Sequence, residues 1–283
     1  MGGARSPKEL KEFLTNMFLD KRIIASKIRF LLSRIIPVLR YKKVWKNYEL
    51  INGTSLYDIT EELSKKMQKI SGKETIYSMR YTKPFLNEVI HKYDEVTLLP
   101  MYPQYSTTTV ESVLDELKDT NYKGKITIIK PFYKDIKFNN LLVKSINNAV
   151  ENTSEWHLIF SAHGIPKKIM TQGDVYQKQI EKQVEILKEL LPNFKSISLA
   201  YQSKIGPSEW LKPYLEDEIP KYSNKKLLVY PLSFLIDNSE TDYELKIEYG
   251  EVAKNHNLQE YKVVTCLNAN TKFAEYLINL SQN

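Results

Sequence analysis

The chain has 283 residues, 42% of them apolar, a formal net charge of +7 and a single cysteine, Cys266. This length allows one large or two medium domains with a sizeable core, and the composition excludes a disordered or fibrous chain. One cysteine excludes an internal disulfide framework, a structural zinc cluster and an iron–sulfur centre ligated within the chain, and it fits a reducing cytoplasm.

The first predicted helix begins with Ser6 as N-cap and Pro7 at its first position. The following basic segment, residues 21–46, mixes Lys and Arg with Ile, Leu and Phe and contains no acidic residue. It predicts an amphipathic helix with a break near Pro37. Such a helix can pack on a sheet with its lysines in water, contact anionic lipid, or form a mouth for an apolar ligand that carries carboxylates.

Beyond the basic segment, predicted strands and helices alternate. The strands are residues 75–79, 95–100, 125–129, 156–162, 196–201, 226–230 and 261–264. The helices are residues 58–70, 84–92, 110–117, 138–150, 176–191, 239–255 and 271–280. Strands without strict polar alternation, separated by helices, indicate parallel sheets covered on both faces. The pattern predicts an α/β fold with two doubly wound halves that divide within residues 131–138.

Ligands of doubly wound folds bind at the carboxyl ends of the strands, so the residues after each strand are the candidates. His163 follows one strand, beside Gly164 and Pro166, which restrict the backbone. A neutral imidazole held in this way can accept a proton or bind a metal, although such a histidine can also be a hydrogen-bonded loop residue. Trp210, after the next strand, is a candidate for stacking on a flat ligand or a core residue.

Three glutamates, Glu240, Glu244 and Glu248, recur every four residues in the predicted helix 239–255. A helix stacks them on one face, where like charges oppose helix formation by roughly 0.2–0.5 kcal/mol per pair. This row suggests a cation or protons that move along it. The alternative is a capped helix start, with Ser239 and Asp242 as a capping box, which accounts only for acids in the first turn.

Several common motifs are absent. GxxxxGK[ST] and GxGxxG do not occur, which argues against a nucleotide cofactor, and GxSxG and HExxH are missing too. The positive charge lies mostly in the basic segment, without the signature of a known nucleic-acid-binding module, so no nucleic-acid partner is expected. No apolar run reaches the length of about 18 residues that spans a bilayer, and no signal peptide is recognisable. We expect a cytoplasmic protein, soluble or peripheral to a membrane.

Seven stretches, in order along nearly the whole chain, resemble ferrochelatase, the enzyme family that inserts ferrous iron into a porphyrin to make haem. They are GGARS (2–6), FLTNMFLD (13–20), MRYTKP (79–84), MYPQYSTTT (101–109), LIFSAHGIPKK (158–168) with GDVY (173–176), YQSKIGPSEWLKP (201–213) and PLSFLIDNSETDYEL (231–245).

The resemblance implies two similar doubly wound domains with a cleft between them. We place an amino-terminal domain at residues 1–134, a second domain at 135–266, and a terminal helix at 267–283 that packs back on the body. It implies a lyase with Fe²⁺ and a porphyrin as substrates, no prosthetic group, and a monomer. The basic segment, residues 21–46, would then be a lip that meets an anionic membrane surface.

The resemblance also implies site residues. His163 and Glu240 would face each other across the porphyrin as catalytic residues and metal ligands, with Asp237, Glu244 and Glu248 behind Glu240. The residues that would line the cleft or bind the propionates are Arg80, Tyr81, Tyr102, Trp210, Ser55, Arg40 and Lys43. Metal insertion requires that two pyrrole protons leave, so His163 would be the base and the carboxylate row would carry protons out or Fe²⁺ in.

The chain departs from the family pattern at three places. The family has an apolar strand before the GG turn, whereas this chain starts at the turn, which suggests a late start or a truncation; the mass of the native protein tests this hypothesis. Asn238 stands where many members have histidine. Asn52 and Leu56 flank Ser55 where a glycine-rich turn followed by proline is usual.

Two alternatives remain open. One is a chelatase for another tetrapyrrole, either coproporphyrin or a cobalt-accepting precursor. The other is a porphyrin- or haem-binding protein without turnover, which would bind porphyrin yet show no metal insertion.

Overall fold

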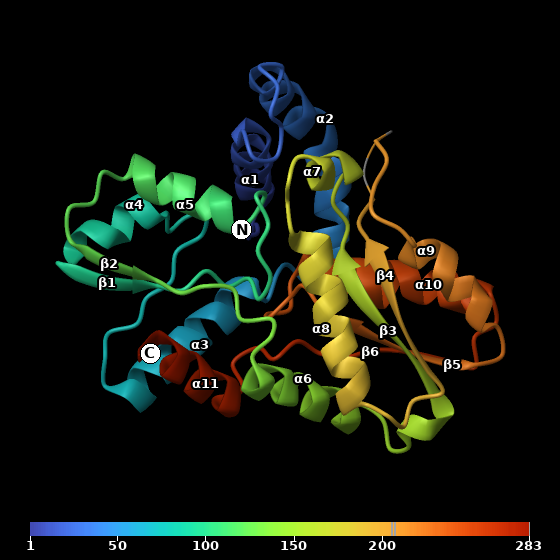
Figure 1. Ribbon diagram of the computed structural model, residues 1–283. Helices are drawn as coiled ribbons and strands as arrows, with labels where there is room; N and C mark the ends of the chain where they lie inside the picture. Colours follow the sequence, from blue (N-terminus) through green and yellow to red (C-terminus); the bar gives the residue numbers. More distant parts are fainter. Residues whose placement is uncertain (205, 207, 283) are drawn as a thin grey trace.

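The computed structural model describes residues 1–204, 206 and 208–282. The chain forms two parallel sheets flanked by helices, one with two strands and one with four (Figure 1). This confirms the predicted α/β class. Residues Ile205 and Pro207 of the YQSKIGPSEWLKP stretch lie outside the described residues. The domain limits at residues 134 and 266 stay a prediction.

The four-stranded sheet carries the candidate site at one edge. Its strands are β3 (Trp156–His163), β4 (Ser196–Gln202), β5 (Lys226–Pro231) and β6 (Glu260–Val263). Their order is β4-β3-β5-β6 and all neighbours are parallel, so their carboxyl ends meet at the same edge. The register sets His163 beside Gln202 on β4, and Ser161 beside Pro231 on β5.

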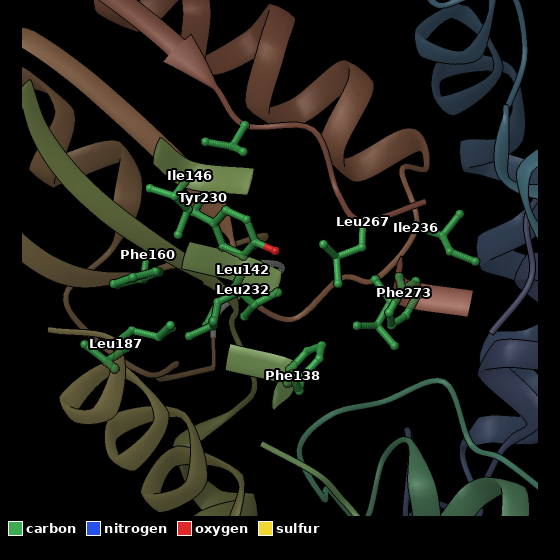
Figure 2. Packing of buried hydrophobic residues seen from close by; sticks show 14 of the residues in the cluster. Phe138, Leu142, Ile146, Phe160, Leu187, Tyr230, Leu232, Ile236, Leu267 and Phe273 are labelled. Atoms are coloured by element: carbon green, nitrogen blue, oxygen red, sulfur yellow. The ribbon is translucent and has the colours of Figure 1, made fainter. Parts of the chain in front are cut away.

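Helices cover both faces of this sheet, because successive strand residues point to opposite sides and the central strands β3 and β5 have buried apolar residues on both, for example Leu158 and Ile159. On one side lie α6 (Ile136–Asn148), α8 (Tyr176–Leu190) and α11 (Thr271–Gln282), and on the other α9 (Leu215–Glu218), a π-helix (Glu240–Glu248) and α10 (Tyr249–Asn255). Figure 2 shows the first core, in which Phe160 and Tyr230 of the sheet pack near Leu142 and Leu187. In the second core, Ile159 of β3 packs with Leu245 of the π-helix.

The amino-terminal half contains the two-stranded sheet and most of the remaining helices. Its elements are α1 (Pro7–Leu19), α2 (Arg29–Leu50), α3 (Leu56–Ser71), α4 (Leu86–Val89), β1 (Glu95–Leu98), α5 (Val110–Asp119) and β2 (Lys125–Ile128). A short helix, α7 (Lys167–Thr171), follows β3. Helix α11 packs against α3 and α6, and α1 packs along α2 (Figure 1). Ser6 caps α1 as predicted, since its Oγ accepts from the N–H of Glu9 at 3.2 Å.

Two expectations for this half are wrong. Residues 75–79 form no strand, because in the described structure only a single backbone bridge, Met79 with Phe85, pairs them with a neighbour. A β-branched segment becomes a strand only where another strand satisfies its backbone. Helix α2 runs without a break through Pro37, which is buried. Packing against α1 outweighs the one hydrogen bond that a proline removes.

A helix that crosses a bilayer has to be both long and apolar. No helix within the described residues meets both conditions.

Candidate active site

His163 ends β3 at the edge of the four-stranded sheet, and its backbone and ring are both held. Its N–H donates to Ser233 Oγ at 3.0 Å, and its Nδ1 lies 2.6 Å from the carbonyl oxygen of Gly164. Nδ1 therefore carries the proton and donates, which leaves Nε2 to face the site. Position 164 needs glycine, because a Cβ there would lie 2.7 Å from the carbonyl oxygen of Gln202.

Opposite His163, the π-helix Glu240–Glu248 follows the loop after β5. Its wide turn is shown by the N–H of Tyr249, which donates to the carbonyl of Glu244 five residues back. The predicted helix over residues 239–255 is present, but its first part is a π-helix, and the alternative of a capping box at Ser239 and Asp242 is wrong. Asn238 starts the helix instead: its Oδ1 accepts from the N–H of Glu240 at 2.8 Å, and Ser239 makes no side-chain cap bond.

His163 and Glu240 lie close together at one edge of the sheet, as the strand ends predict, while their placement across a porphyrin stays a prediction. Nε2 of His163 lies 3.5 Å from Oε1 of Glu240, and the two side chains are 32% and 37% exposed. Burial opposes the charged imidazole, but the carboxylates of Glu240 and Glu244 outweigh it and raise the pKa of His163 to about 9. The other oxygen of Glu240, Oε2, is buried and has no hydrogen-bond partner among the described residues.

Glu244 lies behind Glu240 and is bound to the end of β4. It accepts from Gln202 Nε2 at 3.1 Å, from Ser203 N–H at 2.8 Å and from the Tyr249 hydroxyl at 3.2 Å. Burial, followed by the charge of Glu240, raises the pKa of Glu244. Protons therefore bind Glu244 more readily than an ordinary glutamate.

Glu248, at the end of the π-helix, is exposed. Partial burial of its carboxyl, then the charges of Glu216 and Glu251, raise its pKa, while Lys43 of α2 acts in the opposite direction. The three predicted glutamates thus lie on one π-helix, with a half-buried carboxylate at His163 and an exposed one at the far end.

Asp237 does not join this row. Its side chain is 4% exposed, and its oxygens accept from Asn268 Nδ2 at 2.8 Å and from the N–H of Cys266 at 3.3 Å. These contacts tie the loop before the π-helix to the segment between β6 and α11. A direct catalytic role for Asp237 stays a prediction, and the contacts support a positioning role.

Arg80 and Tyr81, two predicted substrate residues, meet at one buried carboxylate. Arg80 donates to Asp20 Oδ2 at 3.1 Å, and the hydroxyl of Tyr81 donates to the same oxygen at 2.8 Å. Tyr81 is fully buried, and burial raises its pKa. The hydroxyl of Tyr102 accepts from the amino group of Met1 at 2.9 Å. Porphyrin binding by these residues stays a prediction.

The remaining predicted residues lie nearer to the carboxylate row. Ser55 donates to Asp242 of the π-helix at 3.3 Å, and Lys43 acts electrostatically on Glu248. Arg40 is exposed on α2.

Trp210 packs against Gly164, the residue that follows His163. A Cβ built on Gly164 would lie 3.3 Å from Cε3 of the Trp210 indole. Its indole Nε1 is buried without a partner among the described residues.

Sequence reasoning missed the residues that hold the catalytic candidates in place. Ser233 and Tyr176 form hydrogen bonds with the backbone of His163. Gln202 and Ser203 form hydrogen bonds with Glu244. A signal was available, because Tyr176 belongs to the GDVY stretch and the others lie in the residues that follow or end strands β4 and β5.

No three His, Cys, Asp or Glu side chains within the described ranges are arranged to hold a metal ion. The only cysteine, Cys266, is buried, so this chain offers no set of thiolates for an iron–sulfur centre. Metal binding by His163 and Glu240 stays a prediction.

Solved structures with a similar fold include a sirohydrochlorin chelatase. SirB from Bacillus subtilis with Fe³⁺ has a TM-score of 0.59 and 10% identity, and the match covers 81% of this chain and 88% of that one. CbiX, described as the terminal enzyme for biosynthesis of sirohaem in denitrifying bacteria, has a TM-score of 0.57 and 13% identity, with 80% of this chain and 91% of that one covered. At such identities the likeness concerns the fold alone.

Sequence relatives are much nearer. Ferrochelatase of Campylobacter concisus (strain 13826) is 42% identical over 302 residues, which is 100% of this chain and 95% of that protein. Ferrochelatase of Sulfurimonas denitrificans (strain ATCC 33889 / DSM 1251) is 40% identical over 301 residues, 99% of this chain and 95% of that protein. The ferrochelatase family model matches residues 1–283. With a histidine and a carboxylate row facing each other at the edge of a chelatase-like sheet, this chain belongs to the ferrochelatase family.

Proposed function

We propose that His163 and Glu240 carry out the reaction of this ferrochelatase, a metal chelatase of the lyase class that inserts Fe²⁺ into a porphyrin to form haem. The observation that supports these roles is the distance of 3.5 Å between Nε2 of His163 and Oε1 of Glu240, together with the buried second oxygen of Glu240, which no described residue hydrogen-bonds. An unsatisfied buried oxygen is costly unless a ligand or proton completes it.

The reaction replaces two pyrrole protons by one Fe²⁺, so the site has to accept two protons. At neutral pH the imidazole of His163 already holds a proton in the empty site, since its pKa is raised to about 9. The arrival of Fe²⁺ adds positive charge beside the ring and favours release of this proton. Nε2 then accepts one pyrrole proton, and Glu240 Oε2 accepts the other.

Protons leave along the carboxylate row in this proposal. Glu244 has a raised pKa and is hydrogen-bonded to Ser203, whose N–H and hydroxyl both point at its carboxylate. Glu248 reaches solvent at the far end of the π-helix. Raised pKa values suit carboxyl groups that take up and pass on protons near neutral pH.

We propose protoporphyrin IX as the porphyrin, with its two propionates bound by Arg40 and Lys43, which are both exposed on α2. Trp210, which packs against Gly164, offers a flat indole for stacking on the ring, and its Nε1–H has no hydrogen-bond partner among the described residues. Ser55, Arg80, Tyr81 and Tyr102 would complete the cleft.

The experiment is anaerobic incubation of the full chain with Fe²⁺ and either protoporphyrin or coproporphyrin, with formation of the metalloporphyrin followed by its Soret band. We expect a higher kcat/KM for protoporphyrin, and a loss of kcat of about 100-fold or more in His163→Ala and in Glu240→Ala. Full activity in both variants would contradict the assigned roles. Porphyrin binding without insertion by the unaltered chain would favour a binding protein.

We further propose that α2 places the enzyme at the cytoplasmic face of an anionic membrane. Its exposed apolar residues are Phe30, Leu31, Ile35, Val38 and Leu39, and Leu39 is 74% exposed. Exposed arginines and lysines alternate with them, and no acid lies within residues 21–48. Figure 1 shows α2 extending from the body of the protein. An apolar face with a basic rim suits a membrane of negative surface charge.

Sedimentation with lipid vesicles tests this contact. We expect binding to vesicles with anionic lipid that falls with salt, and weak binding to neutral vesicles. The variant Val38→Glu/Leu39→Glu should lose binding and keep its kcat in detergent. Equal recovery of this variant and the unaltered chain with anionic vesicles would contradict the proposal.

A further inference from the structure

Three hydrogen bonds form a closed ring that includes the backbone N–H and the backbone carbonyl of His163. The N–H of His163 donates to Ser233 Oγ at 3.0 Å, and the hydroxyl of Tyr176 donates to the carbonyl oxygen of His163 at 3.0 Å. Tyr176 Oη and Ser233 Oγ lie 2.7 Å apart. A tyrosine hydroxyl has only one proton, and here His163 receives it. The Ser233 hydroxyl therefore donates to Tyr176, and every donor in the ring has one acceptor.

This ring controls the imidazole, because the side chain of His163 is bonded to the adjoining backbone. Nδ1–H donates to the carbonyl of Gly164 at 2.6 Å, so a rotation of the backbone at His163 moves the imidazole with it. Nε2 would then leave its place 3.5 Å from Glu240. Misplacement of a reacting group by about 1 Å can cost on the order of 100-fold in rate.

The ring is connected to the loop between β1 and α5. The N–H of Tyr176 donates to Asp174 Oδ1 at 2.8 Å, and Asp174 Oδ2 accepts from Ser106 Oγ at 2.9 Å and Thr107 N–H at 2.6 Å. Asp174 and Tyr176 are each 6% exposed, so these bonds are shielded from water. The loop after β1 of the two-stranded sheet is thus linked to His163, which ends β3 of the four-stranded sheet.

We propose that Tyr176 and Ser233 are positioning residues for metal insertion, which hold the peptide of His163 so that its Nε2 faces Glu240. This inference rests on the role of His163 proposed above. Burial raises the pKa of Tyr176, so its hydroxyl keeps its proton throughout the working range of the enzyme. Neither residue has to touch porphyrin or iron for this task.

The test compares Tyr176→Phe, Ser233→Ala and the double variant of the full chain in anaerobic initial-rate assays with Fe²⁺ and protoporphyrin. We expect each single variant to lose about 10- to 100-fold in kcat while its KM for porphyrin stays within about twofold. Either change opens the ring, so the double variant should be at most about threefold slower than the slower single variant.

Tyr122→Phe is the matched control. It removes a hydroxyl that also donates to a backbone carbonyl, that of Tyr93 at 2.9 Å, but near the two-stranded sheet. Its kcat should equal that of the unaltered chain. Circular dichroism shows which variants fold, and if Tyr176→Phe does not, the kcat and KM of Ser233→Ala decide.

Unchanged kcat in the folded single variants, losses that multiply in the double variant, or a change in KM alone would overturn the proposal. His163→Ala in the same series distinguishes a failure of the catalytic role of His163 from a failure of the positioning role. If His163→Ala keeps full kcat, the catalytic role of His163 fails, and the positioning role fails with it. If His163→Ala is inactive while Tyr176→Phe has normal kcat, only the positioning role fails.

Discussion

At the scale of single residues, carboxylates with the same side-chain chemistry have different surroundings. Glu240 has one oxygen at His163 and one without a partner, whereas both oxygens of Asp237 accept hydrogen bonds from residues 266 and 268. A carboxylate with an open oxygen can take a proton or a metal ion. One whose acceptors are filled mainly holds the structure together.

Stability measurements should separate these two carboxylates. In Asp237→Asn, one amide nitrogen faces the donor Nδ2 of Asn268, so we expect the free energy of unfolding to fall by about 1–3 kcal/mol. Glu240→Gln should change it by less than about 1 kcal/mol, because its side chain is over a third exposed. Urea unfolding of both variants measures the difference. Equal losses would show that Asp237 is not the structural member of the pair.

The strand pattern predicted that His163 and the carboxylate row meet at one edge of the sheet, because parallel strands bring their carboxyl ends together. The resemblance to a family, not the strand pattern, singled out Glu240 as the partner of His163. The sequence did not predict the direction in which Asp237 points. That direction depends on Asn268, which lies 31 residues later in the chain and is brought near only by the crossover through β6.

At the scale of elements, the π-helix decides how the carboxylates are spaced. A repeat of four residues fits both an α-helix and the wider π-helix, so the spacing of Glu240, Glu244 and Glu248 could not distinguish them. Two residues outside the helix contact it: Asn238 binds its first turn, and Ser203 at the end of β4 binds Glu244.

Asn238 offers a direct test of this element. Asn238→Ala removes the acceptor of the Glu240 N–H, and we expect it to lower the free energy of unfolding by about 0.5–2 kcal/mol and to reduce kcat. Asn238→Asp keeps an acceptor at the same place and should retain most of the stability. Thermal unfolding and the iron-insertion assay provide both measurements. If both variants are as stable as the unaltered chain, Asn238 does not cap the π-helix.

Strands β3 and β5 were predictable because their residues are mostly apolar on both faces, a local property of the sequence. Residues 75–79 have the same β-branched character but lack a neighbouring strand to pair with. Pro37 shows the same limit for helices, since packing of α2 on α1 overrides a local signal for a break. Pairing and packing are non-local, and a single sequence does not contain them directly.

At the scale of the whole molecule, a buried chain of amides links the two sheets. Gln104, after β1, donates through Nε2 to Gln183 Oε1 at 2.6 Å, and Gln183 Nε2 donates to Asn139 Oδ1 of α6 at 3.0 Å. Gln183 and Asn139 are fully buried. Because the proposed site uses residues near both sheets, these buried hydrogen bonds help to hold the two sheets in a fixed relative position.

Gln183→Leu tests the importance of this link. It leaves an acceptor on Asn139 without its donor, and we expect the free energy of unfolding to fall by about 1–3 kcal/mol. Gln177→Leu is the matched control, because this residue of the same helix bonds only Glu181, at an exposed position. Urea unfolding compares them. A loss in the control as large as that in Gln183→Leu would contradict a special role for the buried chain.

In the proposed mechanism, Glu240 sets the protonation of His163, which acts as the base of metal insertion. The pKa of His163 is raised to about 9, so the neutral base is scarce at low pH and kcat/KM should rise with pH up to this value. Removing the carboxylate charge lowers that pKa. The ascending limb of the pH profile in Glu240→Gln should therefore move to lower pH by about one unit or more, whatever the height of the profile.

The most direct measurement is thus the pH dependence of kcat/KM for Fe²⁺ insertion in the unaltered chain and in Glu240→Gln, under anaerobic conditions. We expect a limb near pH 9 in the unaltered chain and a limb at clearly lower pH in the variant. Identical limbs in the two proteins, or a limb that moves to higher pH in the variant, would contradict it.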